Sequence, residues 1–180
     1  MTSRRGQLLI ASPRLRDPNF FKTVVLIVKD DEEDGTLGVI LNRPMTISVS
    51  DAIAEQVDAA ADVTDPIHQG GPCEGPLVAL HTSFSAAGDE VIEGVRFTMD
   101  REAIEWLLAN NQGPIKYFAG YSGWGQGQLD AELEEGAWML TPATQDHVFE
   151  NVGDWSKLTT WLALGRKLDI GRIPDDPSVN

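Results

Sequence analysis

The stretch Ile115-Lys-Tyr-Phe-Ala-Gly-Tyr-Ser-Gly-Trp-Gly-Gln-Gly-Gln-Leu-Asp-Ala-Glu-Leu-Glu134 contains an apolar run, then a glycine-rich run, then an acidic run. The apolar residues at 115–119 are typical of a β-strand. Four glycines follow between residues 120 and 127, and glycine adopts backbone conformations, including positive φ, that other residues avoid. The stretch therefore predicts a strand at 115–119, a glycine-rich turn, and a helix that begins near residue 128.

A glycine-rich turn that leads into a helix could bind an anion, because free backbone N–H groups and the helix dipole point towards it. The glycine spacing here is not G-x-G-x-x-G, and no Lys-Ser/Thr pair follows, as a phosphate-binding loop requires. Asp130 and Glu132 fall in the first helical turn and would repel a phosphate. We therefore expect either a structural turn or a surface for an uncharged ligand or a partner.

The composition limits the classes of function. The 180 residues suffice for one domain with a hydrophobic core, which we expect to span residues 1–171 before a loose tail at 172–180. The formal net charge of −14 argues against direct nucleic-acid binding, because the phosphate backbone is also negative. The single cysteine, Cys73, fits a reducing compartment. Without a signal-peptide pattern or a long apolar run, no membrane segment is expected and the cytoplasm is the expected location.

Shorter patterns predict the other elements. Strands are expected at 7–11, 23–28, 37–41, 76–80, 91–92, 95–98 and 137–141, and helices at 50–60, 101–110, 144–149 and 154–164. Residues 23–28 form an apolar, β-branched run that indicates a strand buried on both faces, and residues 29–35 form an acidic hairpin tip. Gly70-Gly71-Pro72 and Gly75-Pro76 predict turns, and Gly165 predicts the end of the last helix. Because strands and helices mix without regular alternation, the expected fold class is α+β.

Four sequence blocks carry a resemblance to a known family. They are Gly6-Gln-Leu-Leu-Ile-Ala-Ser-Pro13 with Asp17 and Phe20, Gly38-Val-Ile-Leu-Asn-Arg-Pro44, Gly70-Gly-Pro72 with Leu80-His81, and Gly120-Tyr-Ser-Gly-Trp-Gly-Gln-Gly-Gln-Leu-Asp-Ala-Glu132 with Trp138. In this order they resemble the bacterial AlgH/YqgE family over most of the chain. The resemblance implies a single α+β domain with a mixed, curled or barrel-like sheet and flanking helices. It implies no catalytic residues, although some members of that family are labelled transcriptional regulators linked to alginate production.

Single residues offer few candidates for chemistry. His81 follows an expected strand, where polar side chains often line sites, but a hydrogen-bonded structural histidine is the simpler interpretation. The histidine spacing predicts no metal site, and Cys73 beside Glu74 lacks an activating neighbour. Arg43 could bind a carboxylate or phosphate, or pair with one of the chain's own acids. Trp124 either fills the core or stands exposed as an anchor for a ligand or partner.

Three functional hypotheses follow. The first is a cytoplasmic binding or regulatory protein rather than an enzyme, with an unknown protein or small-molecule partner, no cofactor, no metal and no catalytic residue. Its candidate surface comprises Asn42, Arg43, Pro44, Gly70, Gly71, Pro72, His81, Tyr121, Trp124, Gln128, Asp130 and Glu132. The second is an enzyme for an uncharged or cationic small molecule that uses His81 with Asp130 or Glu132. The third is a transcriptional regulator, for which the charge and the lack of a helix-turn-helix pattern favour action through a partner. We expect the first, with these segments sharing one pocket or surface.

Overall fold

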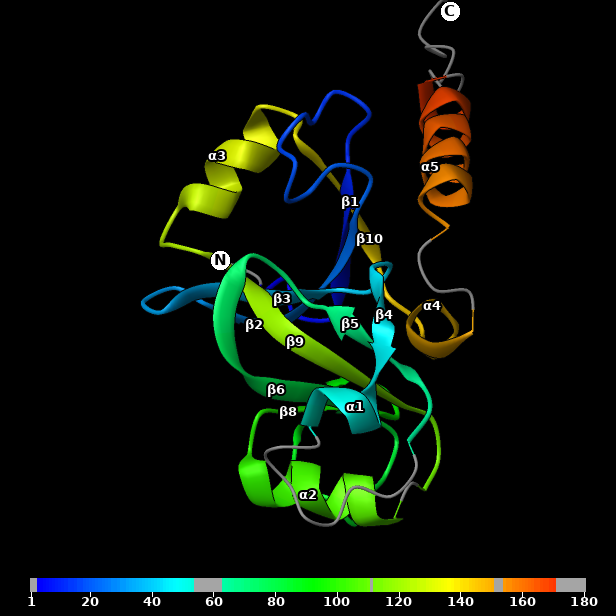
Figure 1. The fold of residues 1–180 in the computed structure, drawn as a ribbon. Coiled ribbons are helices and arrows are strands. Elements are labelled where there is room, and N and C mark those ends of the chain that lie inside the picture. The colour runs from blue at the N-terminus through cyan, green and yellow to red at the C-terminus, as the bar shows by residue number, and fades with distance from the viewer. Residues whose placement is uncertain (1–2, 54–62, 111, 151–153, 171–180) are drawn as a thin grey trace, which may run out of the picture.

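A computed structural model of the chain, shown in Figure 1, describes residues 3–53, 63–110, 112–150 and 154–170. The strands are β1 (Gln7–Ala11), β2 (Val24–Asp31), β3 (Gly35–Ile40), β4 (Pro44–Ser48), β5 (Pro66–Gln69), β6 (Cys73–His81), β7 (Asp89–Ile92), β8 (Val95–Thr98), β9 (Ile115–Trp124) and β10 (Trp138–Pro142). The helices are α1 (Val49–Ile53), α2 (Arg101–Asn110), α3 (Gln128–Glu134), α4 (Gln145–Phe149) and α5 (Trp155–Ile170).

The strands form one curled sheet in the order β10-β1-β2-β3-β9-β6-β8-β7. Strand β5 pairs with β9 in the parallel direction and with β4 on its other side, whereas the other pairings among the described strands are antiparallel. Helix α2 lies beside β6 and β8, while α3, α4 and α5 lie around the opposite part of the sheet (Figure 1). This mixed, curled sheet with flanking helices confirms the predicted α+β class.

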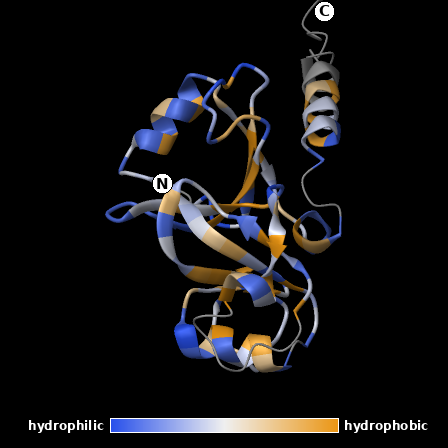
Figure 2. Ribbon diagram, in the orientation of Figure 1, coloured by the Kyte–Doolittle hydropathy of each residue, from blue (hydrophilic) through white to orange (hydrophobic). Residues whose placement is uncertain are grey.

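Strand β2 shows why the sheet is stable. Leu26 and Val28 face one core cluster, and Val25 and Ile27 face another on the opposite side of the sheet. All four side chains are buried, and each contributes about 1.5–3 kcal/mol of hydrophobic stabilisation. The prediction of a strand covered on both faces is confirmed, and Figure 2 shows hydrophobic residues gathered in these central strands.

Strand β9 is longer than predicted, because it continues through the first half of the glycine-rich run as far as Trp124. Its glycines allow close packing of neighbouring strands rather than a turn. Gly120 has a φ of +72°, and a Cβ there would lie 2.6 Å from the Cys73 carbonyl oxygen. A Cβ on Gly70, at the end of β5, would overlap the Gly120 carbonyl oxygen. The expected turn is confined to residues 125–127.

Helices α2 and α5 each begin at an aspartate that caps them. The Asp100 carboxylate accepts from the Ala103 backbone N–H at 2.8 Å, and the Asp154 carboxylate from the Lys157 backbone N–H at 3.1 Å. The expected stop at Gly165 is wrong, since α5 continues to Ile170; a glycine inside a helix costs only about 1 kcal/mol relative to alanine. Among the helices that the structure describes, none is long and apolar enough to cross a membrane.

The structure differs from one predicted turn and describes only part of one predicted helix. The predicted turn at Gly75-Pro76 is wrong, because both residues lie within β6, where the register with β9 shifts between Cys73 and Leu77. Such a bulge accommodates glycine and proline without ending the strand. Of the helix predicted at 50–60, the structure describes α1, and residues 54–62 lie outside the described part of the chain, as does the tail predicted at 172–180.

Replacing Gly70 by alanine tests the close strand packing. We expect Gly70→Ala to lower the free energy of unfolding by about 3 kcal/mol, because the added methyl group overpacks against the backbone of β9. Gly125→Ala is the matched control, since a Cβ there would meet its nearest neighbour at 3.9 Å, and should change stability by less than about 0.5 kcal/mol. Urea unfolding measures both values. Equal stabilities for the two variants would contradict the assignment.

Candidate functional site

Two tryptophans and one carboxylate hold the glycine-rich segment in place. The indole N–H groups of Trp124 and Trp138 both donate to Oε2 of Glu132, at 2.9 and 2.7 Å. Oε1 of Glu132 accepts from the Gln128 side-chain amide at 3.0 Å, and the side-chain Oε1 of Gln128 accepts from the Gly125 backbone N–H at 3.1 Å. These bonds fasten α3 to the ends of β9 and β10.

The Trp124 ring belongs to the core. It is 3% exposed, stacks on Phe20 with ring centroids 5.6 Å apart, and meets Trp138 edge to face at 5.9 Å. Of the two interpretations of Trp124, core packing is therefore the one that the structure supports, and the ring is not available as an exposed anchor. Glu132 serves the same packing by accepting from both indole N–H groups, which would otherwise be buried without partners, and Gln128 in turn donates to the Glu132 carboxylate.

The segment Asn42-Arg43-Pro44 closes the loop that precedes β2. The Asn42 side chain accepts from the Val24 backbone N–H and donates to the Lys22 carbonyl oxygen, each at 2.9 Å. The Arg43 guanidinium donates to the Pro18 carbonyl oxygen at 3.2 Å. Burial lowers the pKa of Arg43, although Asp17 opposes the shift. Arg43 therefore holds its own chain through backbone carbonyl groups.

Three of the family-like blocks converge, but as tightly packed backbone. The Gly70 carbonyl oxygen accepts from the Ile40 backbone N–H at 2.8 Å and from the Ser122 hydroxyl at 3.1 Å. Gly71 and Tyr121 are adjacent, since a Cβ on Gly71 would overlap the Tyr121 carbonyl group. Pro72 is exposed at the turn that follows. The predicted surface is thus partly a structural junction of β3, β5 and β9.

His81 lies elsewhere. It pairs with Ile115 at the start of β9, whereas Trp124 and the helix that carries Glu132 lie at the end of the same strand, roughly 30 Å away along a fully extended strand. His81 is fully buried, both ring nitrogens lack a hydrogen-bond partner within the described structure, and burial lowers its pKa. The predicted pairing of His81 with Asp130 or Glu132 as an acid–base site is therefore wrong.

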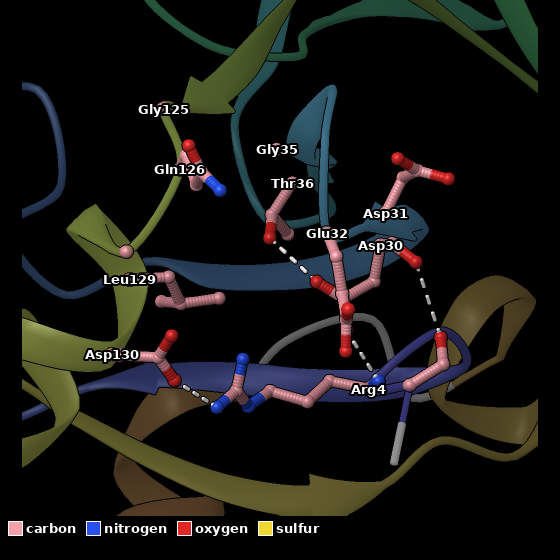
Figure 3. Close-up of a pocket in the computed structure, with 12 residues that line it drawn as sticks. Arg4, Asp30, Asp31, Glu32, Gly35, Thr36, Gly125, Gln126, Leu129 and Asp130 are labelled. Atoms are coloured by element: carbon pink, nitrogen blue, oxygen red, sulfur yellow. Dashed lines mark hydrogen bonds and ion pairs between the residues drawn. The ribbon is translucent and has the colours of Figure 1, made fainter. Parts of the chain in front are cut away.

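Asp130 lines a cavity of about 310 Å³ beside the acidic hairpin tip. Figure 3 shows the Arg4 guanidinium directed at Asp130, with which it forms an ion pair. The Asp30 carboxylate accepts from the Arg4 backbone N–H and from the Thr36 hydroxyl, both at 2.6 Å. These polar groups satisfy one another. We therefore interpret them as structural contacts that link the N-terminal segment to β3 and α3, and not as a binding site.

A second cavity, of about 530 Å³, lies where β4, β5 and the start of β9 meet α4. It is lined by Leu41, Asn42, Pro44, Asp65, Pro66, His68, Gly113, Pro114, Ile115, Lys116, Tyr117, Phe149 and Glu150. Two of the predicted surface residues, Asn42 and Pro44, are among them. Its size lies within the range of small-molecule sites, and its walls combine apolar side chains with a few polar ones, as such sites usually do.

Lys116 is the distinctive residue of this cavity. Its Nζ donates to the Val148 carbonyl oxygen in the last turn of α4 at 2.8 Å. Burial lowers the pKa of Lys116 to about 8, because an ammonium group is less stable away from water. At neutral pH the side chain is therefore a partly dehydrated ammonium group in equilibrium with an appreciable amount of free amine.

His68 and Tyr117 add two buried polar groups to the partly buried Lys116. His68 is 8% exposed, its Nδ1 has no hydrogen-bond partner in the described structure, and its pKa is lowered to about 4 by burial and then by the charge of Lys116. The Tyr117 hydroxyl is also buried without a partner there, and burial together with Asp65 raises its pKa. Both side chains are therefore neutral at pH 7. No three His, Cys, Asp or Glu side chains of the described residues form a metal-binding cluster.

Lys116 and His68 were not among the residues predicted from the sequence. A signal was present, since Lys116 is a basic residue within the apolar run 115–119 and His68 follows an apolar residue in a short strand. Neither pattern reveals that the side chain is removed from solvent without an ion-pair partner, because this environment depends on how α4 and β5 pack against β9. Only the folded structure brings these residues to one cavity.

Comparisons with known proteins place this structure among relatives. A family model described as AlgH-like matches residues 8–169. A UPF0301 protein of Chlorobium limicola is 38% identical over 98% of this chain and 96% of its own length. A UPF0301 protein of Streptomyces coelicolor is 36% identical over 100% and 97%. The solution structure of the AlgH protein from Pseudomonas aeruginosa is similar with a TM-score of 0.72 and 26% identity, covering 98% of this chain and 97% of that one.

Removing the Glu132 carboxylate tests the tryptophan junction. We expect Glu132→Ala to lower the free energy of unfolding by about 2–3 kcal/mol, because two indole N–H groups lose a charged acceptor. Glu135→Ala, an exposed residue that follows the same helix, should change it by less than about 0.5 kcal/mol. Urea unfolding followed by tryptophan fluorescence measures the difference. A similar effect of both substitutions would contradict the structural role of Glu132.

The low pKa of His68 predicts a pH dependence of stability. Between pH 6.5 and about 4 the unfolded chain binds a proton at this residue and the folded chain does not, so acidification favours unfolding. We expect the wild type to lose about 1–2 kcal/mol more than His68→Gln between pH 7 and pH 5, after allowance for solvent screening. Parallel pH profiles of the two proteins in urea unfolding would show that His68 titrates equally in both states.

Proposed function

This chain belongs to the AlgH-like family, and we propose that it is a binding protein for a small, uncharged molecule rather than an enzyme. The ligand would occupy the cavity formed by β4, β5, β9 and α4, with Lys116 as its main polar contact. The family membership confirms the resemblance found in the sequence. The relatives' printed names state no activity, so the proposal is supported by the cavity alone.

The observation that carries the proposal is the unusual environment of the Lys116 ammonium group. Arg4, Lys29 and Arg101 form ion pairs with carboxylates, and Arg43 donates to backbone carbonyl oxygens away from this cavity. Lys116 also donates to a backbone carbonyl oxygen, but it lines the cavity, and burial is the cause of its lowered pKa. An ammonium group has three donors, so Lys116 keeps donor capacity for a ligand in the cavity.

The cavity walls indicate the charge of the ligand. Asp65 and Glu150 line the cavity and oppose the single positive charge of Lys116, so an anionic ligand would gain little electrostatic energy there. Ile115 and Phe149 supply apolar wall. These features support an uncharged molecule with an apolar body and an oxygen atom that accepts a hydrogen bond from Lys116.

The composition supports a cellular location and limits the class of partner. We place the protein in the cytoplasm, because its single cysteine fits a reducing compartment. The net charge of −14 argues against direct contact with DNA. An influence on transcription would therefore pass through a protein partner.

Filling the cavity tests the proposal. Pro66 is exposed and lines the cavity, whereas Pro72 is exposed in the turn after β5 and does not line it. Backbone amide NMR spectra would be recorded with benzyl alcohol, benzoate and benzylamine. For the wild type and Pro72→Trp, we expect benzyl alcohol to shift the signals of residues 115–117. We expect Pro66→Trp to reduce this shift at least about fivefold, because the indole occupies the ligand volume.

Two outcomes would contradict the proposal. Shifts that persist in Pro66→Trp would place binding outside the cavity. A larger response to benzoate than to benzyl alcohol would show that the site selects anions, in which case the assignment of an uncharged ligand is wrong.

A further inference from the structure

We propose that Lys116 captures the carbonyl group of an aldehyde ligand as a reversible imine within the cavity formed by β4, β5, β9 and α4. This inference rests on the proposed function, because it names the ligand class for the same cavity. It goes further by making the bound state covalent. The capturing atom is Nζ of Lys116, and the ligand is an uncharged aldehyde with an apolar body.

The fold holds Lys116 in a fixed position, as a nucleophile requires. Its strand, β9, pairs with β6 on one side and with the parallel strand β5 on the other, and Lys116 itself lies opposite Leu80 in β6. The Nζ atom is further held by the Val148 carbonyl oxygen at 2.8 Å. Backbone and amine are therefore both ordered before a ligand arrives, which reduces the entropy lost when a bond forms.

The amine also has the required protonation state. Only a neutral amine attacks a carbonyl carbon, and lysines that do so are commonly desolvated in apolar surroundings. With a pKa of about 8, about one Lys116 in ten is neutral at pH 7, compared with about one in three thousand for an ordinary lysine. No carboxylate of the described residues lies within ion-pair distance of Lys116 to favour the charged form.

The reaction balances without a further reactant. The Nζ lone pair forms a bond to the aldehyde carbon, and the carbonyl oxygen takes both protons of the neutral amine. The carbon–oxygen bond then breaks and water leaves, so that the carbon–oxygen double bond is replaced by a carbon–nitrogen double bond. Hydrolysis reverses the step. The carboxylates of Asp65 and Glu150 in the cavity wall favour an aldehyde without a negative charge over a carbonyl compound that carries a carboxylate.

Lys116 also has a structural role, which the test must separate from capture. Its bond to the Val148 carbonyl oxygen lies in the last turn of α4, where a cation stabilises the helix end. An arginine retains the charge and the donors but forms no stable imine with an aldehyde under these conditions, because its guanidinium is not deprotonated in proteins. Lys116→Arg is therefore the variant that preserves the cap and removes capture.

The experiment is reductive trapping. The protein is incubated at pH 7 with benzaldehyde and sodium cyanoborohydride, which reduces imines to stable benzyl amines, and the labelled residues are identified by peptide mass spectrometry. We expect Lys116 to be labelled at least about tenfold faster than Lys29 or Lys157, in line with its larger neutral fraction. The α-amino group, whose ordinary pKa is about 8, serves as an internal reference of similar basicity. Lys116 should also be labelled faster than this group, and Pro66→Trp should remove that excess.

The outcomes separate the two proposals. Labelling of Lys116 no faster than the α-amino group, or unchanged in Pro66→Trp, would overturn imine capture. If Lys116 labelling fails in either of these ways but benzyl alcohol still shifts residues 115–117 of the wild type, the binding function stands while capture fails. If benzyl alcohol and benzaldehyde both leave the cavity signals unchanged, both proposals fail. Labelling of Lys116 that is faster than that of the α-amino group and loses this excess in Pro66→Trp supports capture, and a Lys116→Arg variant that unfolds at the wild-type urea concentration shows that the cap does not depend on the amine.

Discussion

The close backbone contact between Gly70 and Gly120 is the constraint on which the rest of the structure depends. It allows the short strand β5 to enter beside β9 in the parallel direction, while the Gly70 carbonyl oxygen also accepts a hydrogen bond from Ile40 at the end of β3. Since β9 pairs with β3, β5 and β6, a side chain at this contact would push three strands apart. The cavity that holds Lys116 exists because β5 is inserted here, next to the beginning of β9.

Much of the fold could be predicted from the sequence, because burial of apolar side chains leaves a local pattern. The run at 23–28 identified a strand covered on both faces, and the helix predicted at 101–110 corresponds to α2. The glycine-rich run was harder, because glycine is suited both to a turn and to close strand contact. Sequence alone does not distinguish these uses, so β9 was predicted to end before Gly120. The same ambiguity led to the incorrect turn at Gly75.

The candidate site was less predictable than the fold. Asn42 and Pro44 do line the larger cavity, but Trp124 and His81 are buried and lie at opposite ends of β9. The family-like blocks are rich in polar and aromatic residues that satisfy one another inside the structure, as Glu132 does for two indole groups. Lys116 was missed because what distinguishes it is the burial of its amine beside a backbone carbonyl oxygen rather than in an ion pair. That environment is made by residues distant in sequence.

Strand β1 lies between β2 and β10, so residues 7–11 pair with residues 138–142 at the far end of the chain. During synthesis, one edge of β1 must therefore wait, with unpaired N–H and C=O groups, until most of the protein has left the ribosome. Pairings across such long separations close slowly, in milliseconds to seconds rather than microseconds. An apolar edge left open for that time is able to pair with another nascent chain. The architecture thus ties correct assembly in the cell to the protection of this one edge while translation proceeds.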